Sequence, residues 1–443
     1  MPCGPSNTRS NRRLEPGGWP RVTESFWQRY WRFPIIWKVL VGFVAGAVTG
    51  LAVGPSIEVV QPLGTLFLRL LQMLVMPLVF FTLIVGAASI RPSQLGRAGA
   101  KIMVYYLLTS ALAVTLGVLL ALAVNPGQGL SMPADGAEAR MPPPLSQVLL
   151  GIVPTNPFAA LAQGDVLAVI FFALVVGVAL GVLRHSGQQQ GASLSEGLLA
   201  IFRGINEVMY VMVRGVLEYA PIGVFALIAV TLGRTGVAAL VPLAKLTGVV
   251  YGGTAAQIGL YALLLALFGV KQRRFWGVAY EPMAMAFVTR SSNGTLPVTM
   301  RAAERLGIRE SLYGFSLPLG ATINMDGTAL YLGASVVFVA NVAGIDLTPT
   351  QLLGVIVTGV LASIGTAGVP GAGLIMLSLA ITQAGLPMAP VGLVAGIDAL
   401  LDMVRTMCNV TGDLVGTQIV ARVEPGFLEE PTRAQVEGVG VAS

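Results

Sequence analysis

The sequence predicts an all-α membrane protein with eight transmembrane helices and two re-entrant helical hairpins. Of its 443 residues, 55% are hydrophobic and only 11% are charged, and the mean hydropathy is +0.78. Soluble domains carry about a quarter charged residues, so this chain has too few polar side chains to cover a water-facing surface. The long apolar runs are therefore predicted to span lipid.

Composition also disfavours several classes of function. The net charge is +6, but the lysines and arginines fall in short loops between apolar runs, as topology signals do, and not in a nucleic-acid-binding patch. The only two cysteines, Cys3 and Cys408, lie in unlike segments and do not suggest a disulfide framework or a metal site. With a single histidine, His185, we expect neither histidine-based catalysis nor zinc binding.

The first 422 residues divide into a polar start and a series of apolar stretches. Residues 1–34 are rich in arginine and lack a small-residue cleavage site, so we predict a cytoplasmic N-terminal tail. Six apolar stretches that predict spans then follow, at 37–54, 62–90, 102–124, 145–183, 205–232 and 244–270. The fourth contains Pro154 and Pro157 and is expected to be broken.

The charge of the loops predicts the orientation in the membrane. Basic residues follow the second, fourth, sixth and last spans, whereas the alternate loops hold few, and residues 55–61 hold none. The loop at 232–245 is a weak exception, with Arg234 and Lys245. The positive-inside rule then places both termini in the cytoplasm and favours an even number of crossings, for which eight is the best count.

Two later apolar segments, 275–304 and 350–386, are interrupted by SSNGTLP and GTAGVPGAG. Such Gly- and Pro-rich centres cannot continue a helix, and lipid cannot satisfy the freed backbone groups. Each segment is therefore predicted to be a re-entrant hairpin, and each precedes one span, 311–342 or 389–421. A hairpin and a span that occur twice in opposite orientations indicate an inverted repeat with its site at the midplane. Residues 423–443 are expected to be a flexible tail.

The last span carries a polar face. At about 100° per residue its polar side chains fall within an arc of about 80°. These side chains are Asp398, Asp402, Arg405, Thr406, Asn409 and Asp413. An intramembrane charge costs on the order of 3 kcal/mol, so this face predicts a pathway or a binding site. A structural ladder of salt bridges is the alternative, which the excess of acids over arginine disfavours.

The span before it contains GATINMDGTALY, in which Asp326 precedes Gly327. A glycine beside an acid in mid-span suggests a local unwinding that frees carbonyl oxygens, and such an oxygen-rich cage suits Na⁺. A kink with a solvated Asp326 is the alternative. The four acids of the two spans, with Arg290 and Arg405, sum to −2, and an acidic substrate makes −3. About three monovalent cations would neutralise this charge.

The hairpin tips supply further polar groups. The first tip holds Arg290, Ser291, Ser292, Asn293 and Thr295. The second holds Ser363 and Thr366. Helix N-termini at such breaks present unpaired N–H groups that favour a carboxylate ligand. Loose helix packing is the alternative explanation for any single glycine.

Several motifs together resemble the glutamate transporter homologue family, the dicarboxylate/amino acid:cation symporters, and are close to its archaeal sodium/aspartate symporters. They are YYLLTS (105–110), VPTNPF (153–158), RSSNGTLPVTM, GATINMDGTALY, GTAGVPGAG and the D-x₃-D-x₂-R-T-x₂-N-x₃-D face. The resemblance covers residues 35–422. It implies a homotrimer that works by an elevator mechanism. The scaffold would consist mainly of spans 1, 2, 4 and 5, and the transport domain mainly of spans 3, 6, 7 and 8 with both hairpins.

The resemblance also implies site residues. Arg405 would bind the substrate side-chain carboxylate and Asp402 its amino group. The remaining substrate-binding residues would be Arg290, Thr328, Thr406 and Asn409, with backbone at Ser292, Val369 and Gly373. One sodium site would use Asp413 with carbonyls of Gly320, Asn324 and Asn409. A second would use carbonyls of Thr322, Ser363, Ile364 and Thr366. A third would use Tyr106, Thr109, Ser110, Asn324 and Asp326.

The function that the sequence predicts is sodium-coupled symport of an acidic amino acid, L-aspartate before L-glutamate, across the cytoplasmic (inner) membrane. No covalent chemistry is needed, so we expect no enzyme. A proton-coupled glutamate or C4-dicarboxylate symporter is the alternative within the same class, and an anion channel is the alternative of another class. An intramembrane hydrolase is disfavoured because the acidic face lacks a nucleophile–base pair. Asn293 stands where close relatives carry a third serine, which bears on selectivity and gating.

Overall fold

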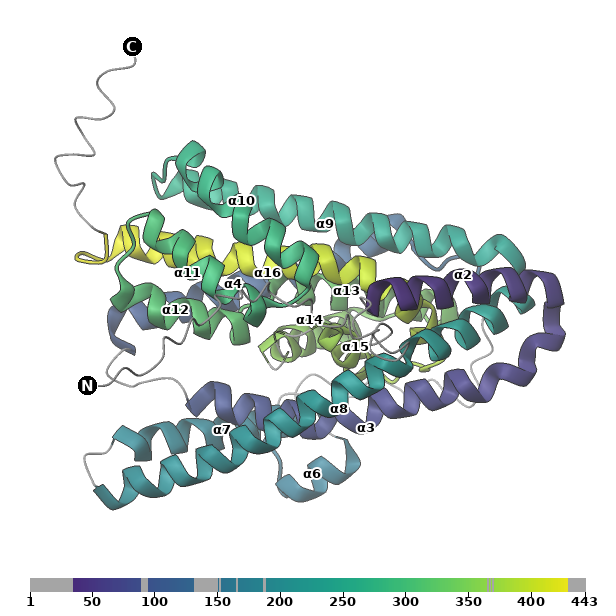
Figure 1. Cartoon of the computed structure of the whole chain (residues 1–443), viewed down its shortest axis with the longest axis horizontal. Helices are drawn as coiled ribbons and strands as arrows, with labels where there is room; N and C mark the ends of the chain where they lie inside the picture. The colour runs from purple at the N-terminus through teal and green to yellow at the C-terminus, as the bar shows by residue number, and fades with distance from the viewer. Residues whose placement is uncertain are drawn as a thin grey trace, which may run out of the picture.

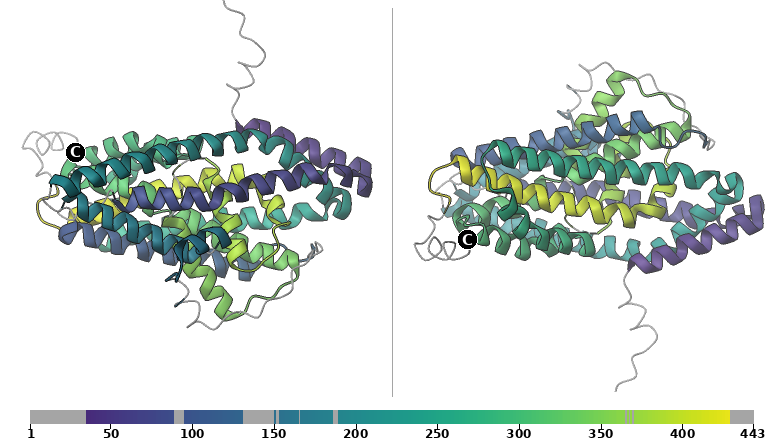
Figure 2. Two further views of the ribbon diagram at one scale, coloured as in Figure 1. Left: turned by 90° about the horizontal axis from the view of Figure 1, so that it is seen from below. Right: turned by 90° about the horizontal axis from the view of Figure 1, so that it is seen from above.

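The computed structural model describes residues 35–88, 95–130, 150, 153–164, 166–185, 189–364, 366, 368 and 370–428. Within these ranges every extended regular element is a helix, and the only β-pairing is an isolated bridge between Ile308 and Leu428. The longest helices run side by side along an elongated bundle (Figure 1; Figure 2). The all-α prediction is therefore confirmed. The N-terminal tail and most of the C-terminal tail lie outside the described residues.

Long apolar helices agree with a membrane protein. Among the described residues, five helical stretches are long and apolar enough to cross a bilayer. One of them, residues 189–267, spans two consecutive helices and is much longer than one crossing needs. The count of eight crossings remains a prediction.

The first helices coincide with the predicted spans. They are α2 (Ile35–Val53), the 3₁₀ segment η1 (Gly54–Val60), α3 (Gln61–Ala88), the π-helical turn η2 (Leu95–Gly99) and α4 (Ala100–Val124). The stretch expected to be broken contains the short α6 (Pro157–Gln163) and then α7 (Val166–His185). Asn156 caps α6, since its side-chain oxygen accepts the N–H groups of Phe158 and Ala159 at 3.1 Å each.

The fifth predicted span belongs to a longer helix than its hydropathy indicates. Helix α8 (Gln189–Thr235) has 47 residues, which at about 1.5 Å per residue is about 70 Å. Hydropathy predicts only residues 205–232, because the first turns of the helix are polar and a search for apolar runs does not detect them. The 3₁₀ turn η3 (Gly236–Ala239) and α9 (Leu240–Leu267) follow.

Three glycines bring α2 against α8. Gly42, Gly46 and Gly50 repeat every fourth residue, and a Cβ on them would lie 2.3, 2.4 and 2.4 Å from carbonyl oxygens of α8. The α8 residues concerned are Pro221, Phe225 and Ala229. The two backbones thus touch directly, as small residues at every fourth position allow in membrane helices.

Both interrupted segments form a pair of helices. The first pair is α10 (Gln272–Thr289) and α11 (Ser292–Arg305), joined through Arg290, whose φ of 54° is left-handed. The second pair is α14 (Pro349–Ile364) and α15 (Ala372–Gln383). The second glycine- and proline-rich centre separates two helices as predicted, whereas the first break falls at Arg290 and Ser291 and most of SSNGTLP forms the start of α11. Re-entry of the two pairs into the membrane from opposite sides remains a prediction.

The two spans that follow the hairpins differ from each other. One is broken at Asn324 and Met325 into α12 (Glu310–Ile323) and α13 (Asp326–Ala343), so the predicted unwinding near Asp326 is confirmed. The other, α16 (Val391–Val423), is continuous over 33 residues. Helix α13 is buried over nearly its whole length and packs against α4, α9, α14, α15 and α16.

After α16, residues 424–428 fold back as a short segment that we call the C-terminal strap. The Lys101 Nζ and Glu424 Oε1 atoms form an ion pair of 2.5 Å. The Arg309 N–H donates to the Phe427 carbonyl at 2.9 Å. The strap therefore ties the end of α16 to the starts of α4 and α12.

Candidate functional site

The polar face of α16 is buried in the interior of the bundle. All six of its predicted side chains are at most 6% exposed, and Arg405 is 1% exposed. The face therefore points into protein and not toward lipid, as the cost of an intramembrane charge requires.

Arg405 is paired on α16 itself. Its Nη2 lies 2.6 Å from Asp402 Oδ1 and its Nη1 lies 3.2 Å from Asp398 Oδ1. The guanidinium carbon also stands 4.4 Å from the ring centroid of Tyr331 on α13, in a cation–π contact. Two carboxylates and an aromatic face thus hold one cation in a fixed orientation.

The second hairpin meets this pair at the start of α15. The Gly371 N–H donates to Asp402 Oδ2 at 3.1 Å. A Cβ at Gly373 would lie 2.3 Å from Arg405 Cζ, so only a glycine allows the helix to approach the guanidinium so closely. The Thr406 hydroxyl donates to Asp402 Oδ1 at 3.3 Å.

Asn409 links α16 to the start of α13. Its Oδ1 accepts the N–H groups of Gly327 at 2.8 Å and Thr328 at 3.3 Å, and its Nδ2 donates to Thr328 Oγ1 at 3.2 Å. The side chain of Asn409 thus satisfies donors that the first turn of a helix leaves open. A Cβ at Gly327 would lie 2.2 Å from the Arg405 carbonyl oxygen, so this contact also requires glycine.

The tips of the two hairpins are joined by hydrogen bonds. The Ser291 hydroxyl at 2.8 Å and the Asn293 N–H at 3.1 Å both donate to the Gly368 carbonyl. Ser291 also caps α11 by accepting the Gly294 N–H at 3.0 Å. These hydrogen bonds hold the first hairpin tip in place against the second.

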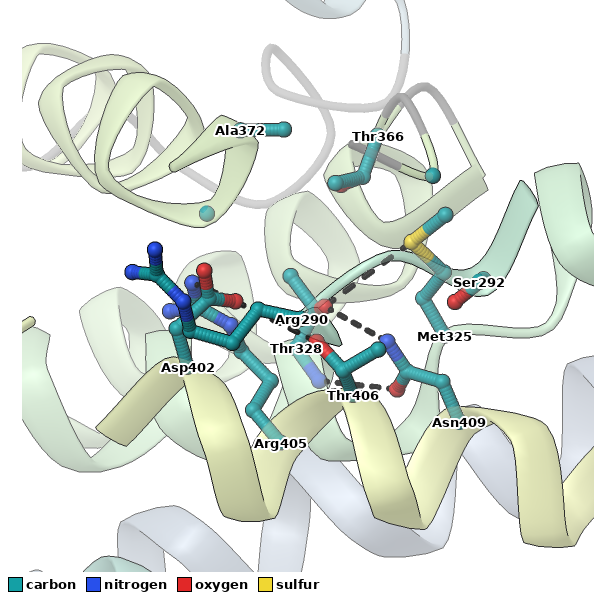
Figure 3. A pocket seen from close by; sticks show the side chains of 12 residues that line it. Arg290, Ser292, Met325, Thr328, Thr366, Ala372, Asp402, Arg405, Thr406 and Asn409 are labelled. Carbon is teal, nitrogen blue, oxygen red and sulfur yellow. Dashed lines mark hydrogen bonds and ion pairs between the residues drawn. The ribbon is translucent and has the colours of Figure 1, made fainter. Parts of the chain in front are cut away.

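These groups surround a small pocket with about 220 Å³ of empty space. Figure 3 shows side chains from neighbouring elements facing this space. The pocket brings together predicted residues from α16, α13 and both hairpins. Its lining consists of Arg290, Ser292, Met325, Thr328, Thr366, Gly368, Ala372, Gly373, Asp402, Arg405, Thr406 and Asn409. Val369 lies outside the described residues.

A second polar cluster surrounds Asp326, which is fully buried. Its Oδ1 accepts the Ser110 hydroxyl at 2.7 Å, and its Oδ2 accepts the Tyr261 hydroxyl at 2.5 Å and the Gln257 amide at 3.4 Å. Ser110 was among the predicted residues, whereas Gln257 and Tyr261 of α9 were not. Their spacing of four residues inside an apolar span places both on one helix face, and that pattern could have pointed to them.

A third cluster surrounds Asp413. Asn324 Nδ2 donates to Asp413 Oδ1 at 2.9 Å, and the Thr109 hydroxyl donates to Asn324 Oδ1 at 3.3 Å. A Cβ at Gly320 would lie 2.5 Å from Asp413 Oδ1 and 2.6 Å from the Tyr106 hydroxyl. The predicted third ion set spans these two clusters, which adjoin: a Cβ at Gly412 would lie 2.6 Å from the Tyr261 hydroxyl and 2.9 Å from Asn324 Nδ2.

The remaining predicted ion ligands bond to their own helices. The hydroxyls of Ser363 and Thr366 donate to carbonyls of α14 at 2.7 and 2.8 Å, and Ile364 is the last residue of α14. The Thr322 hydroxyl donates to the Pro318 carbonyl at 3.3 Å. A hydroxyl that donates keeps its oxygen lone pairs, so these hydroxyls and the neighbouring carbonyl oxygens are both groups that an ion could use here.

Sequence comparison decides the family. The family described as the sodium:dicarboxylate symporter family matches residues 35–423. The chain belongs to this family. It is therefore a transporter of the dicarboxylate and acidic amino acid symporter kind, and an integral multi-pass membrane protein.

Relatives in the sodium:dicarboxylate symporter family are similar over nearly the whole chain. A proton/sodium-glutamate symport protein of Bacillus caldotenax is 31% identical, over 89% of this chain and 96% of the relative. A proton/glutamate-aspartate symporter of Escherichia coli (strain K12) is 32% identical, over 89% and 94%. A C4-dicarboxylate transport protein of Rhodospirillum rubrum is 30% identical, over 96% and 95%.

Proposed function

We propose that the protein is a sodium-coupled secondary active symporter of acidic amino acids, with L-aspartate preferred to L-glutamate. The observation that carries the proposal is the buried pair of Asp402 and Arg405 at a pocket formed by α13, α16 and both hairpin tips. A cation and an anion side by side in one pocket match the ammonium and the side-chain carboxylate of an acidic amino acid.

In the proposed binding mode, the side-chain carboxylate of the substrate takes the Arg405 guanidinium in a bidentate contact. Asp402 accepts the substrate ammonium. Thr328, Thr406 and Asn409 complete the pocket, and backbone at the hairpin tips closes it. Binding exchanges one carboxylate partner of Arg405 for another, so the guanidinium remains charge-paired throughout.

The proposed sodium ions bind at the oxygen-rich clusters around Asp326 and Asp413 and at carbonyls near the end of α14. Both acids are buried and, among the residues that the structure describes, accept hydrogen bonds from neutral donors only. A monovalent cation at each cluster would balance a charge that these neutral donors leave uncompensated. About three ions per substrate remains the proposed stoichiometry.

We further propose that the protein is a homotrimer of the inner membrane with cytoplasmic termini. Spans 3, 6, 7 and 8 with both hairpins would move as the transport domain against a fixed scaffold. The second hairpin would act as the outer gate.

The test is uptake of radiolabelled L-aspartate into proteoliposomes. An inward sodium gradient should drive accumulation above the external concentration, and replacing sodium with choline should abolish it. Accumulation against a gradient also distinguishes a symporter from an anion channel, which can only equilibrate its substrate. Equal uptake in sodium and choline would contradict sodium coupling.

A second candidate is a proton-coupled symporter of glutamate or of C4-dicarboxylates. It is favoured by the names of the relatives, which include proton/glutamate-aspartate and C4-dicarboxylate transporters at similar identity. A proton gradient without sodium should drive uptake in that case. Competition by succinate would separate the substrates, because a C4-dicarboxylate has no ammonium for Asp402 to bind.

A further inference from the structure

Two cavities lie between α8 and the pocket and adjoin it in turn. The widest has about 1210 Å³ of empty space and is lined by Arg214 and Glu218 of α8 and by Ser291 and Pro370 of the hairpin tips. The next has about 420 Å³, shares Pro370 with the widest, and adds Arg290. Arg290 also lines the pocket that contains Asp402 and Arg405. The shared lining residues place the three spaces next to one another, with Arg290 between the pocket and its neighbour.

Two arginines, Arg214 and Arg290, line the walls of these cavities. Arg214 is exposed and Arg290 is half-buried, and neither has an acidic partner within the part of the chain that the structure describes. Among the acids on the same walls, Glu218 Oε2 lies 2.8 Å from Lys38 Nζ, whereas Asp398 and Asp402 share the single cation Arg405. The shared pairing leaves one negative charge at the pocket, and Arg214 and Arg290 add two positive charges, so the net charge of the walls is positive.

We propose that Arg214 guides the anionic substrate, which reaches the pocket through the space between α8 and the hairpin tips. This inference rests on the proposed function. A cleft that is lined by one sign of charge and has low-dielectric walls concentrates the opposite charge and raises its association rate. Arg214 lines the cavity beside α8 and not the pocket, so it would act on the approach of the substrate and not on its bound state.

The experiment measures association and dissociation rates of L-aspartate on the purified full-length protein by stopped flow. Sodium is held constant, and choline chloride varies the ionic strength. Arg214→Gln should lower the association rate about tenfold at low ionic strength, and the difference should shrink as salt screens the charge. The dissociation rate should stay within about twofold, because steering changes encounter and not contacts in the complex.

Matched variants give the inference its controls. Arg214→Lys keeps the charge and should behave like the wild type, whereas Arg214→Glu should lower the rate further. Arg203→Gln removes an exposed charge from the same helix, 11 residues away and outside the three cavities, and should have no effect. Arg214→Met provides the same test if the glutamine variant does not fold.

The outcomes separate this inference from the proposed function. If the wild type binds aspartate and Arg214→Gln associates as fast with the same salt dependence, steering is wrong and the proposed function stands. A change confined to the dissociation rate would also overturn the steering proposal. So would an equal decrease of the association rate in Arg203→Gln. If the wild type binds neither aspartate nor glutamate, the proposed function fails and this inference fails with it.

Discussion

Arg405 is held on several sides at once. Asp398 and Asp402 pair with its guanidinium, Tyr331 lies against its face, and Gly373 leaves no room for a Cβ beside it. In the proposed binding mode, the substrate carboxylate would meet a guanidinium that is already oriented. Such preorganisation reduces the ordering that binding requires.

We predict that Gly373→Ala lowers acidic-substrate affinity by at least about tenfold, because the new methyl group would displace the Arg405 guanidinium. The measurement is the Kd of L-aspartate by titration of the purified protein. Gly354→Ala, on the other arm of the same hairpin, is the control, since nothing lies within 4 Å of a Cβ there. Equal affinities in the two variants would show that the close approach at Gly373 is unimportant.

We also predict that Asp326→Asn weakens sodium activation of uptake by at least about tenfold. The amide keeps the shape of the side chain but removes the buried charge that we assign to cation binding. The measurement is the sodium concentration that gives half-maximal uptake. Asp346→Asn, at an exposed acid beyond α13, is the control. Unchanged sodium dependence in the Asp326 variant would remove Asp326 from the proposed ion site.

The residues of the pocket could largely be predicted from the sequence, and the contacts between them only in part. The polar face of α16 follows from helical periodicity, because all its members lie on one element. Gln257 and Tyr261 approach Asp326 from a separate helix, and no spacing along the chain encodes that meeting. For the same reason the sequence could not show that Tyr106 lies with Asp413.

At the scale of single elements, the approximate places of the breaks in both hairpins and between α12 and α13 could be predicted from the small and polar residues inside apolar runs. The positions of the breaks could not, because Pro297 and Pro318 lie inside helices and the breaks fall at Arg290–Ser291 and Asn324–Met325. The length of α8 could not, because hydropathy reports burial in lipid and its first turns are polar. The role of the glycine repeat of α2 could not be predicted either, because it depends on contact with the backbone of α8, which is distant in the sequence.

We predict that Gly46→Ala destabilises the protein by about 1–3 kcal/mol, because its Cβ would lie 2.4 Å from the Phe225 carbonyl oxygen and force α2 away from α8. The measurement is chemical denaturation in detergent. Gly248→Ala in α9 is the control, since a Cβ there meets nothing within 4 Å. Similar stabilities of the two variants would mean that α2 can shift without loss.

Across the whole molecule, two distant parts of the chain close over the pocket. The first hairpin tip is bonded to the second through the Gly368 carbonyl, although 75 residues separate Asn293 from Gly368. In the proposed mechanism, entry and exit of the substrate would require these tips to part.

We predict that a disulfide between Asn293→Cys and Gly368→Cys stops transport. A Cβ at Gly368 would lie 2.9 Å from Asn293 Cγ, which is within the reach of a disulfide. Oxidant should reduce aspartate uptake at least about tenfold, and reductant should restore it. Each single variant, in a Cys3→Ser background, should be insensitive to oxidant. Full uptake by the cross-linked protein would show that the tips need not separate.

The C-terminal strap has a practical consequence. Because Phe427 is held to Arg309 through main-chain atoms, a fluorophore attached at Leu428 would follow the position of α12 and α16. A second dye on η1, near the opposite end of the helices, would convert any relative sliding of the two regions into a change in energy transfer. Single-molecule recordings could then measure the duration of each movement without any change to the residues of the pocket.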